Sequence, residues 1–178
     1  MPSRHGSVSG RRGADMARYV VLNEATIAAT PDEIVGAFLE EAAGRSQWWQ
    51  PFLRMRQRGG KPLPEIGAVV DMTVAGEGPL GQRWGTIRLC GRVTAFDPDR
   101  HLVLEYFEGD FRGSEEWTLV PVDAGHTRIT TRWRTDPQGA VRLAARFADV
   151  PGSYSKVMEE GFRGIERFTA QRRTESQR

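Results

Sequence analysis

Cysteine and histidine are scarce in this sequence of 178 residues. The single cysteine, Cys90, excludes a disulfide within the chain. The three histidines are His5, His101 and His126, and none stands at metal-ligand spacing from another histidine or from the cysteine. We therefore expect no metal site.

Long apolar runs are missing as well. No segment approaches the roughly 20 apolar residues that a bilayer span needs, and residues 1–15 lack the apolar core of a signal peptide. Hydrophobic residues make up 39% of the chain and charged residues 27%, which is a globular composition. We expect a soluble, cytoplasmic protein without an integral membrane segment.

The basic charge is confined to the two ends of the chain. The pI is near 9.0, but the excess of arginine lies in residues 1–16 and 171–178, and residues 17–170 are slightly acidic. Nucleic-acid binding needs a clustered basic face on the folded domain, so a nucleic-acid partner is not expected. We predict a disordered extension over 1–16, with Met1 and Met16 both acceptable starts, one domain over 17–170, and a frayed basic tail over 171–178.

The chain opens with a strand followed by a capped helix. Residues 19–28 are rich in Val, Ile, Thr and Tyr, which favour strands. Thr30-Pro31-Asp32-Glu33 combines a capping box with a proline in the first helical turn, and Gly44 is well placed to end the helix. The helix carries one apolar stripe, formed by Ile34, Val35, Phe38, Leu39 and Ala42.

The middle of the chain has the period of β-strands. Strand-like segments span 52–58, 68–75, 83–96, 102–107, 113–122 and 127–134. Short turns rich in Gly, Asp and Pro join most of them, which implies antiparallel pairing. Asp136-Pro137 predicts the start of a helical region, with a break at Pro151-Gly152 and a restart capped by Ser153. Apolar residues then recur at three- and four-residue spacing as far as Phe168.

This order of elements resembles the START/Bet v 1-like (SRPBCC) helix-grip superfamily, in particular its polyketide cyclase/dehydrase and lipid-transport branch. The residues that carry the likeness are 27–35, Trp48-Trp49, Glu65-Ile66-Gly67, 116–121 and 125–128. The resemblance implies an α+β fold in which a curved antiparallel sheet of about seven strands wraps around a long C-terminal helix, with one or two short helices after the first strand. It also implies an apolar cavity between the sheet and that helix. The superfamily shares no active-site motif, so it implies no catalytic residue.

Strand alternation indicates which side chains face the cavity. Arg128, Arg132 and Arg134 belong in water, so the residues between them should face the C-terminal helix. The predicted cavity residues are Trp49, Met72, Trp117, Thr131, Trp133, Phe147, Tyr154 and Met158. These side chains either line a ligand site or only fill a core, and the polar tips of the tryptophans and tyrosines need partners when buried.

Glu115 is the most informative polar residue, and it has two interpretations. On the inner face, a raised pKa would suit a general acid or base acting beside Tyr106, so these two are the candidate catalytic residues. At the cavity rim it would simply be solvated, and we favour that position. Asn23 and Thr131 are weaker candidates for orienting a ligand. Trp48 and Trp49 are expected at the cavity mouth, one packed and one available as a lid.

No cofactor is expected. Residues 76–81 match the pattern GxGxxG, but a strand-like segment follows where a dinucleotide site needs a helix. The leading hypothesis is a carrier or sensor that binds a small hydrophobic molecule, lipid or polyketide-like, in the cavity. One alternative is a cofactor-free polyketide cyclase, aromatase or dehydratase. Another is an interaction protein similar to the Hsp90 activators, with an unknown protein partner.

Overall fold

The computed structural model describes residues 18–77, 83–98 and 100–178, and the predicted N-terminal extension and the tip of the 76–81 loop fall outside these ranges. Seven strands and three helices follow in the order expected. They are β1 (Tyr19–Ile27), α1 (Pro31–Ala42), β2 (Leu53–Arg58), β3 (Val69–Glu77), β4 (Arg83–Asp97), β5 (His101–Gly109), β6 (Phe111–Pro121), β7 (Thr127–Pro137), α2 (Gly139–Ala144) and α3 (Val150–Ser176).

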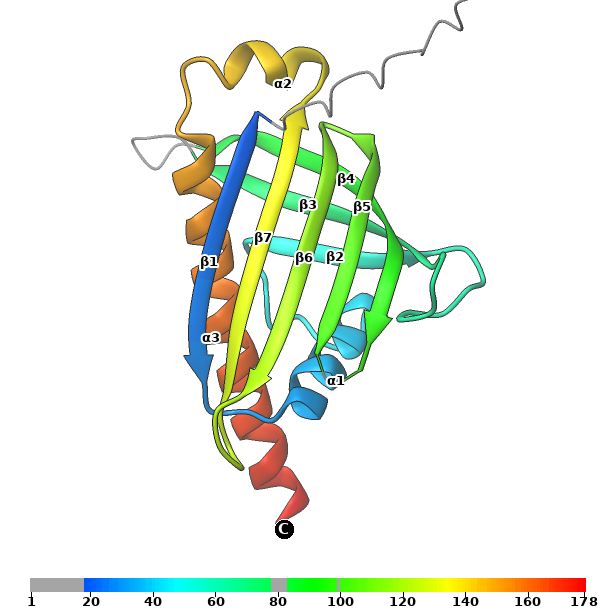
Figure 1. Cartoon of the computed structure of the whole chain (residues 1–178), viewed down its shortest axis with the longest axis vertical. Helices are drawn as coiled ribbons and strands as arrows, with labels where there is room; N and C mark the ends of the chain where they lie inside the picture. The colour runs from blue at the N-terminus through cyan, green and yellow to red at the C-terminus, as the bar shows by residue number, and fades with distance from the viewer. Residues whose placement is uncertain (1–17, 78–82, 99) are drawn as a thin grey trace, which may run out of the picture.

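The strands form one antiparallel sheet in the order β1-β7-β6-β5-β4-β3-β2. The strands from β2 to β7 pair with their neighbours in sequence, and β1 closes the other edge by pairing with β7. The sheet bends so strongly that β2, β3 and β4 run nearly across the direction of β1, β7 and β6 (Figure 1). α3 lies along the concave side, so the fold is the predicted helix-grip fold.

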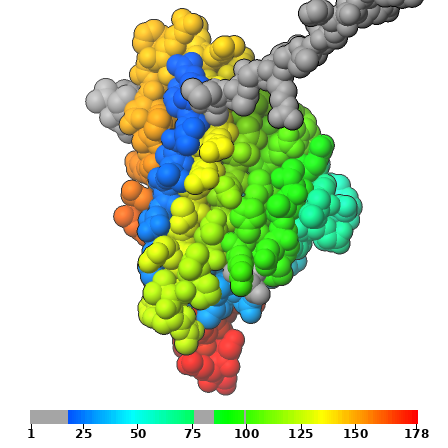
Figure 2. Space-filling view, in the orientation of Figure 1, coloured from blue at the N-terminus to red at the C-terminus, as the bar shows by residue number. Residues whose placement is uncertain are grey.

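The arginine ladder of β7 lies on the outer face of the sheet, as predicted. Arg128, Arg132 and Arg134 are exposed, whereas Ile129 and Trp133 between them are buried. Figure 2 looks onto this outer face, where β1, β7, β6 and β5 lie side by side. The inner face therefore supplies the core.

The predicted capping box begins α1. Thr30 Oγ1 accepts the backbone N–H of Glu33, and the Glu33 carboxylate accepts the backbone N–H of Thr30 at 2.8 Å. The same carboxylate binds the Arg173 guanidinium of α3, which lowers the pKa of Glu33 to about 2. In the structure α3 continues to Ser176, into the predicted basic tail over 171–178, and Arg173 also donates to the Ala28 carbonyl.

The predicted helix start at Asp136-Pro137 was wrong. These residues end β7, where they pair with Arg112 and Phe111 of β6. Proline is tolerated at the end of a ladder because little pairing is lost there. The helical region begins after them, with α2 at Gly139.

The cap of α3 lies four residues before the predicted one. The Asp149 carboxylate accepts the backbone N–H of Gly152 at 2.9 Å, so Asp149 rather than Ser153 caps the helix. Pro151 then falls in the first turn, where its missing N–H costs nothing. The proline therefore belongs to the helix start and does not interrupt it.

Two glycines of α3 let the segment after α1 approach the helix closely. A Cβ at Gly161 would lie 2.5 Å from a ring carbon of Trp49, and one at Gly164 would lie 2.5 Å from the Trp48 carbonyl oxygen. Glu41, which is only 2% exposed, accepts the backbone N–H of Trp48 at 2.9 Å from the other side. The two tryptophans are thus held between α1 and α3.

Among the described residues, no helix has the length and apolar character required to cross a bilayer.

Substituting alanine for Gly161 should destabilise the protein, although alanine is the better helix former. At Gly36 of α1 a Cβ meets nothing within 4 Å, so Gly36→Ala should stabilise by about 0.5–1 kcal/mol. At Gly161 the crowding against Trp49 should outweigh this gain and cost about 1–3 kcal/mol. Urea unfolding of both variants tests the difference, and equal stabilisation would contradict the close packing.

Candidate functional site

A pocket of about 70 Å³ opens between α1 and the concave face of the sheet. Its walls are almost entirely apolar, and Glu115 is the one buried charged residue in them. The lining residues are Val35, Phe38, Leu39, Ala42, Trp49, Leu53, Met55, Leu63, Pro64, Val70, Met72, Phe96, Asp97, His101, Leu102, Leu104, Glu115, Trp117 and Leu119.

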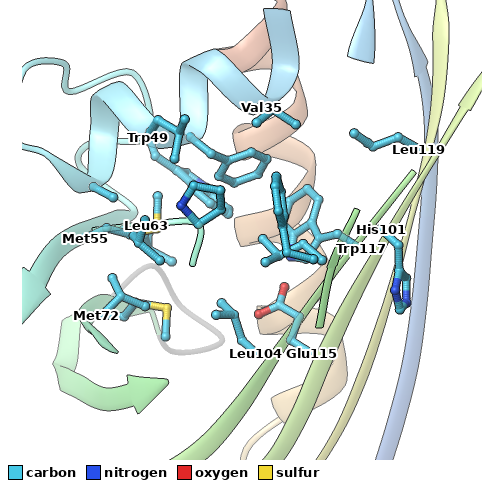
Figure 3. Close-up of a pocket in the computed structure, with 18 of the residues that line it drawn as sticks. Val35, Trp49, Met55, Leu63, Met72, His101, Leu104, Glu115, Trp117 and Leu119 are labelled. Atoms are coloured by element: carbon cyan, nitrogen blue, oxygen red, sulfur yellow. The ribbon is translucent and has the colours of Figure 1, made fainter. Parts of the chain in front are cut away.

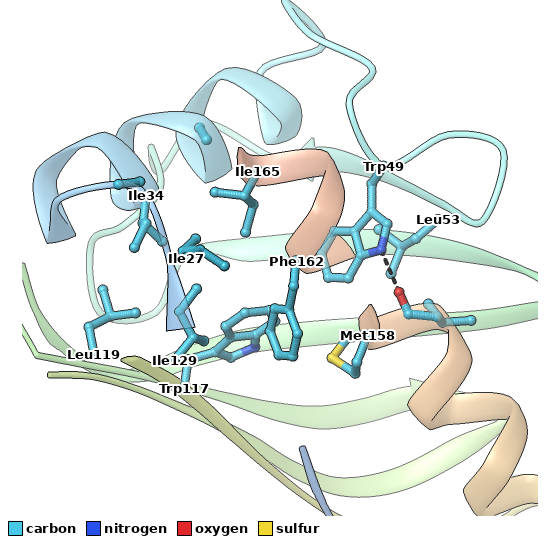
Figure 4. Close-up of a cluster of buried hydrophobic side chains, with 13 residues drawn as sticks. Ile27, Ile34, Trp49, Leu53, Trp117, Leu119, Ile129, Met158, Phe162 and Ile165 are labelled. Atoms are coloured by element: carbon cyan, nitrogen blue, oxygen red, sulfur yellow. Dashed lines mark hydrogen bonds between the residues drawn. The ribbon is translucent and has the colours of Figure 1, made fainter. Parts of the chain in front are cut away.

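This position differs from the predicted one between the sheet and α3. No α3 residue lines the pocket, because side chains fill that space (Figure 4). Trp117 packs edge-on against both Trp49 and Phe162, with ring centroids 6.0 Å apart in each case. Met158 and Ile165 are almost completely buried beside them. The pocket is thus confined to the α1 side of the sheet.

The Glu115 side chain lies inside the molecule and points into the pocket between Leu104 and Trp117 (Figure 3). It is 5% exposed, so the favoured rim position was wrong. The residue sits in the middle of β6, paired with Leu104 of β5 and Trp133 of β7, and not at the end of the strand.

Two tyrosines donate hydrogen bonds to the Glu115 carboxylate. The Tyr106 hydroxyl of β5 donates to Oε2 of Glu115, and the Tyr154 hydroxyl of α3 donates to Oε1 at 2.9 Å. The Trp133 ring stacks on Tyr154, with centroids 4.4 Å apart and planes 7° from parallel. Glu115 thereby connects the sheet, the helix and the pocket.

Burial dominates the electrostatics of this group. It raises the pKa of Glu115, and the hydrogen bonds from the tyrosines oppose that rise. Burial also raises the pKa of Tyr106 and Tyr154 well above the ordinary value, and the neighbouring carboxylate adds to the effect. Both tyrosines therefore remain protonated and keep donating to Glu115.

The structure brings only part of the predicted cavity set into the pocket. Trp49, Met72 and Trp117 line it together with Glu115. Of the remaining members, Thr131, Trp133 and Met158 are buried and Tyr154 is partly buried, and these four pack on the α3 side without lining the pocket.

Phe147 does not belong to this set. It is 78% exposed, in the connection between α2 and α3, and its predicted place in the interior was wrong. The helical pattern suggested a face that continues through residue 147, but α2 ends at Ala144 and α3 starts only at Val150. The chain between them turns the ring into solvent.

Thr131 and Asn23 face each other across β7 and β1 on the α3 side. Thr131 Oγ1 and Asn23 Nδ2 are buried and have no hydrogen-bond partner among the described residues. Neither residue lines the pocket, so neither is placed to orient a ligand there.

The indole N–H groups of both tryptophans after α1 donate to backbone carbonyls. Trp49 is 3% exposed, and its indole N–H donates to the Val157 carbonyl at 3.0 Å, as the dashed line in Figure 4 shows. The Trp48 indole N–H donates to the Ala37 carbonyl at 2.8 Å. Trp49 is therefore a wall of the pocket, and the role of lid that we expected for one of the two has no support in this geometry.

Sequence reasoning missed the contribution of α1. Ile34 and Ala37 are buried in the core, whereas Val35, Phe38 and Leu39 face the pocket. The apolar stripe of α1 was visible in the sequence, and it is wider than a helix needs if it packs against α3 alone. This width was the signal that α1 faces the pocket as well as the core.

Among the described residues, no group of three or more His, Cys, Asp or Glu side chains is arranged to hold a metal ion. Cys90 is buried on β4, and burial raises the pKa of its thiol to about 11, so it is not a nucleophile at neutral pH.

No protein-family model and no curated protein matches this sequence. Solved structures do show the same fold. The Zhui aromatase/cyclase from Streptomyces sp. R1128 has a TM-score of 0.63 at 16% identity, covering 86% of this chain and 94% of its own. A START superfamily protein from Mycobacterium smegmatis has a TM-score of 0.60 at 14% identity, covering 85% and 97%. The ginseng major latex-like protein 151 from Panax ginseng has a TM-score of 0.57 at 13% identity, covering 85% of this chain and 97% of its own. The predicted resemblance is thus confirmed as a likeness of fold.

The raised pKa of Glu115 predicts a pH-dependent difference between the wild type and Glu115→Gln. A carboxyl whose pKa is higher in the folded state loses stability as the pH rises through that pKa, because the folded state must then bury a charge. The wild type should therefore lose stability relative to Glu115→Gln as the pH rises above 4.5. Urea unfolding at several pH values measures this, with Glu105→Gln on the outer face as the control for removing a carboxylate. A difference that stays constant with pH would contradict the raised pKa.

Proposed function

We propose that this chain binds a small, largely apolar molecule in the pocket between α1 and the sheet, as a carrier or sensor. The observation that supports it is an apolar cavity with one buried polar group, Glu115, directed into it. Ligand sites in proteins commonly combine apolar walls with a few polar groups that fix orientation. A cavity inside a closely packed protein also forfeits dispersion contacts, which a ligand restores.

The size of the cavity limits the ligand. A single water needs roughly 10–15 Å³ on this measure, so 70 Å³ holds only a few waters. A whole lipid or polyketide would require wall residues to move. The pocket as it stands fits one small ring or a branched aliphatic group.

Filling the pocket with a larger side chain should abolish this binding. Leu102 lines the pocket and is partly buried, so Leu102→Trp should occupy the space a ligand needs. Val120→Trp places the same ring on the outer face, where Val120 is 47% exposed, and should leave binding unchanged. Toluene titrated into ¹⁵N-labelled protein and followed by NMR is the probe. Unaltered shifts of pocket residues in the wild type, or full binding by Leu102→Trp, would refute the assignment.

A second candidate is a cofactor-free cyclase or dehydratase for a polyketide-like substrate. The observation that favours it is the pairing of Glu115 with Tyr106, since convergent titratable groups are what an enzyme needs and a carrier does not. In an aldol cyclisation, Glu115 would take a proton from a methylene carbon between two carbonyls. That carbon would bond to another carbonyl carbon, and Glu115 would return the proton to the alkoxide formed. The small cavity is the argument against a long substrate.

Turnover of a synthetic poly-β-ketone thioester tests the second candidate. If Glu115 is the acid and base, Glu115→Gln should lower kcat by about 100-fold or more, since general acid–base catalysis is worth about 10²–10⁴. Glu105→Gln on the outer face should keep wild-type turnover. Full turnover by Glu115→Gln would remove Glu115 from the chemistry.

An interaction protein similar to the Hsp90 activators would need a continuous exposed apolar patch. The large apolar side chains that are exposed among the described residues are divided among β1, β6, α2 and three connections, and they are Val20, Leu22, Ile66, Val120, Val122, Leu143 and Phe147. This distribution favours the pocket over a protein interface as the functional feature.

A further inference from the structure

The Glu115 carboxylate has no positive partner. Its hydrogen bonds come from neutral donors, the hydroxyls of Tyr106 and Tyr154 and the side chain of Trp117. No lysine or arginine is among the described residues that line the pocket. His101 lines it too, but its Nε2 lies 2.8 Å from the carboxylate of Glu116 on the outer face. A buried carboxylate without a counter-charge is costly, so such a group either takes up a proton or is paired with a positive charge.

The pocket can accommodate the missing charge. A carboxylate has about four acceptor positions. Tyr106, Tyr154 and Trp117 use three of those on Glu115, so one remains for a ligand. Asp97 adds a second carboxylate among the lining residues. Trp49 and Trp117 also line the pocket, and indole rings attract a desolvated cation. Acidic groups and aromatic walls thus coincide in one small cavity.

A neutral ligand would not stabilise the ionised form of Glu115. A hydroxyl group donates one hydrogen bond to a carboxylate but brings no opposite charge. An ammonium group brings both, and a charge-assisted hydrogen bond is roughly twice as strong as a neutral one. The cavity volume of about 70 Å³ limits the apolar part to one ring or a compact aliphatic group.

We infer that the pocket selects small organic cations, namely protonated primary amines with a compact aromatic or aliphatic body, over neutral molecules of the same shape. The ammonium group lies against Glu115 and the apolar body against the walls formed by α1 and the strands. This inference rests on the proposed binding function and adds the class of ligand to it.

Three probes of nearly equal shape separate charge from hydrogen bonding and from apolar contact. Toluene has no donor, benzyl alcohol has a neutral donor, and benzylamine has a charged one. NMR titration of the wild type at pH 7.5 should show benzylamine binding about tenfold or more tightly than benzyl alcohol, which is a difference of about 1.4 kcal/mol. Glu115→Gln should reduce that ratio to near one, whereas Glu105→Gln, which removes an exposed carboxylate, should keep it.

A pH series on the wild type gives a second test that needs no variant. Benzylamine affinity should fall as the pH is lowered through the pKa of Glu115, whereas toluene affinity should change little. The other titratable groups at this site are Tyr106 and Tyr154 behind the carboxylate, and Asp97 and His101 in the pocket lining. Repeating the series with Glu115→Gln separates their contribution from that of Glu115.

The outcomes distinguish failure of the cation preference from failure of the proposed binding function. Equal binding of all three probes by the wild type would overturn the preference for cations and leave the proposed function standing. A benzylamine preference that survives in Glu115→Gln would also overturn it, because the charge partner would lie elsewhere. Failure of every probe to bind would remove the proposed function together with the inference.

Discussion

The close approach of Trp49 to Gly161 is the contact on which the arrangement of the interior depends. It brings the segment after α1 against α3, and Glu41 fixes the same segment from α1 through the backbone of Trp48. The indole then fills the gap between the sheet and α3, where a cavity of this fold was expected. Because the ring occupies that space, the remaining void lies beside α1 on the same concave face. The position of the pocket is thus a consequence of helix packing.

Glu115 depends on this arrangement in turn. Its carboxyl lies at the boundary between the filled and the empty part of the interior, with Tyr154 of α3 on one side and the pocket on the other. The tyrosines satisfy its hydrogen-bonding capacity only in part and do nothing for its charge. The residue is therefore stabilised enough to be kept in the core, and it is still available to a ligand.

The sequence predicted the strands, α1 and the inward face of each strand well, because alternation and capping are local patterns. The orientation of Glu115 was within reach of the same pattern, and the error was to treat its strand position as an end. Phe147 was misplaced because a helical period does not reveal where a helix is interrupted. The location of the pocket was beyond sequence reasoning, since it depends on a contact between Trp49 and Gly161 that are far apart in the chain. The periodicity of a sequence shows which face of a helix or strand is apolar, but it does not show which other element packs against that face.

The pairing of β1 with β7 has a consequence for how the chain is made. Strands β2 to β7 each pair with the strand that precedes or follows them, so they can assemble in order as they leave the ribosome. β1 is synthesised before the other strands, yet among the residues that the structure describes it pairs with the last strand alone. Closing so long a loop is slow and costs chain entropy. During synthesis, both edges of the first strand therefore stay unpaired until β7 is made, and unpaired strand edges are prone to aggregation.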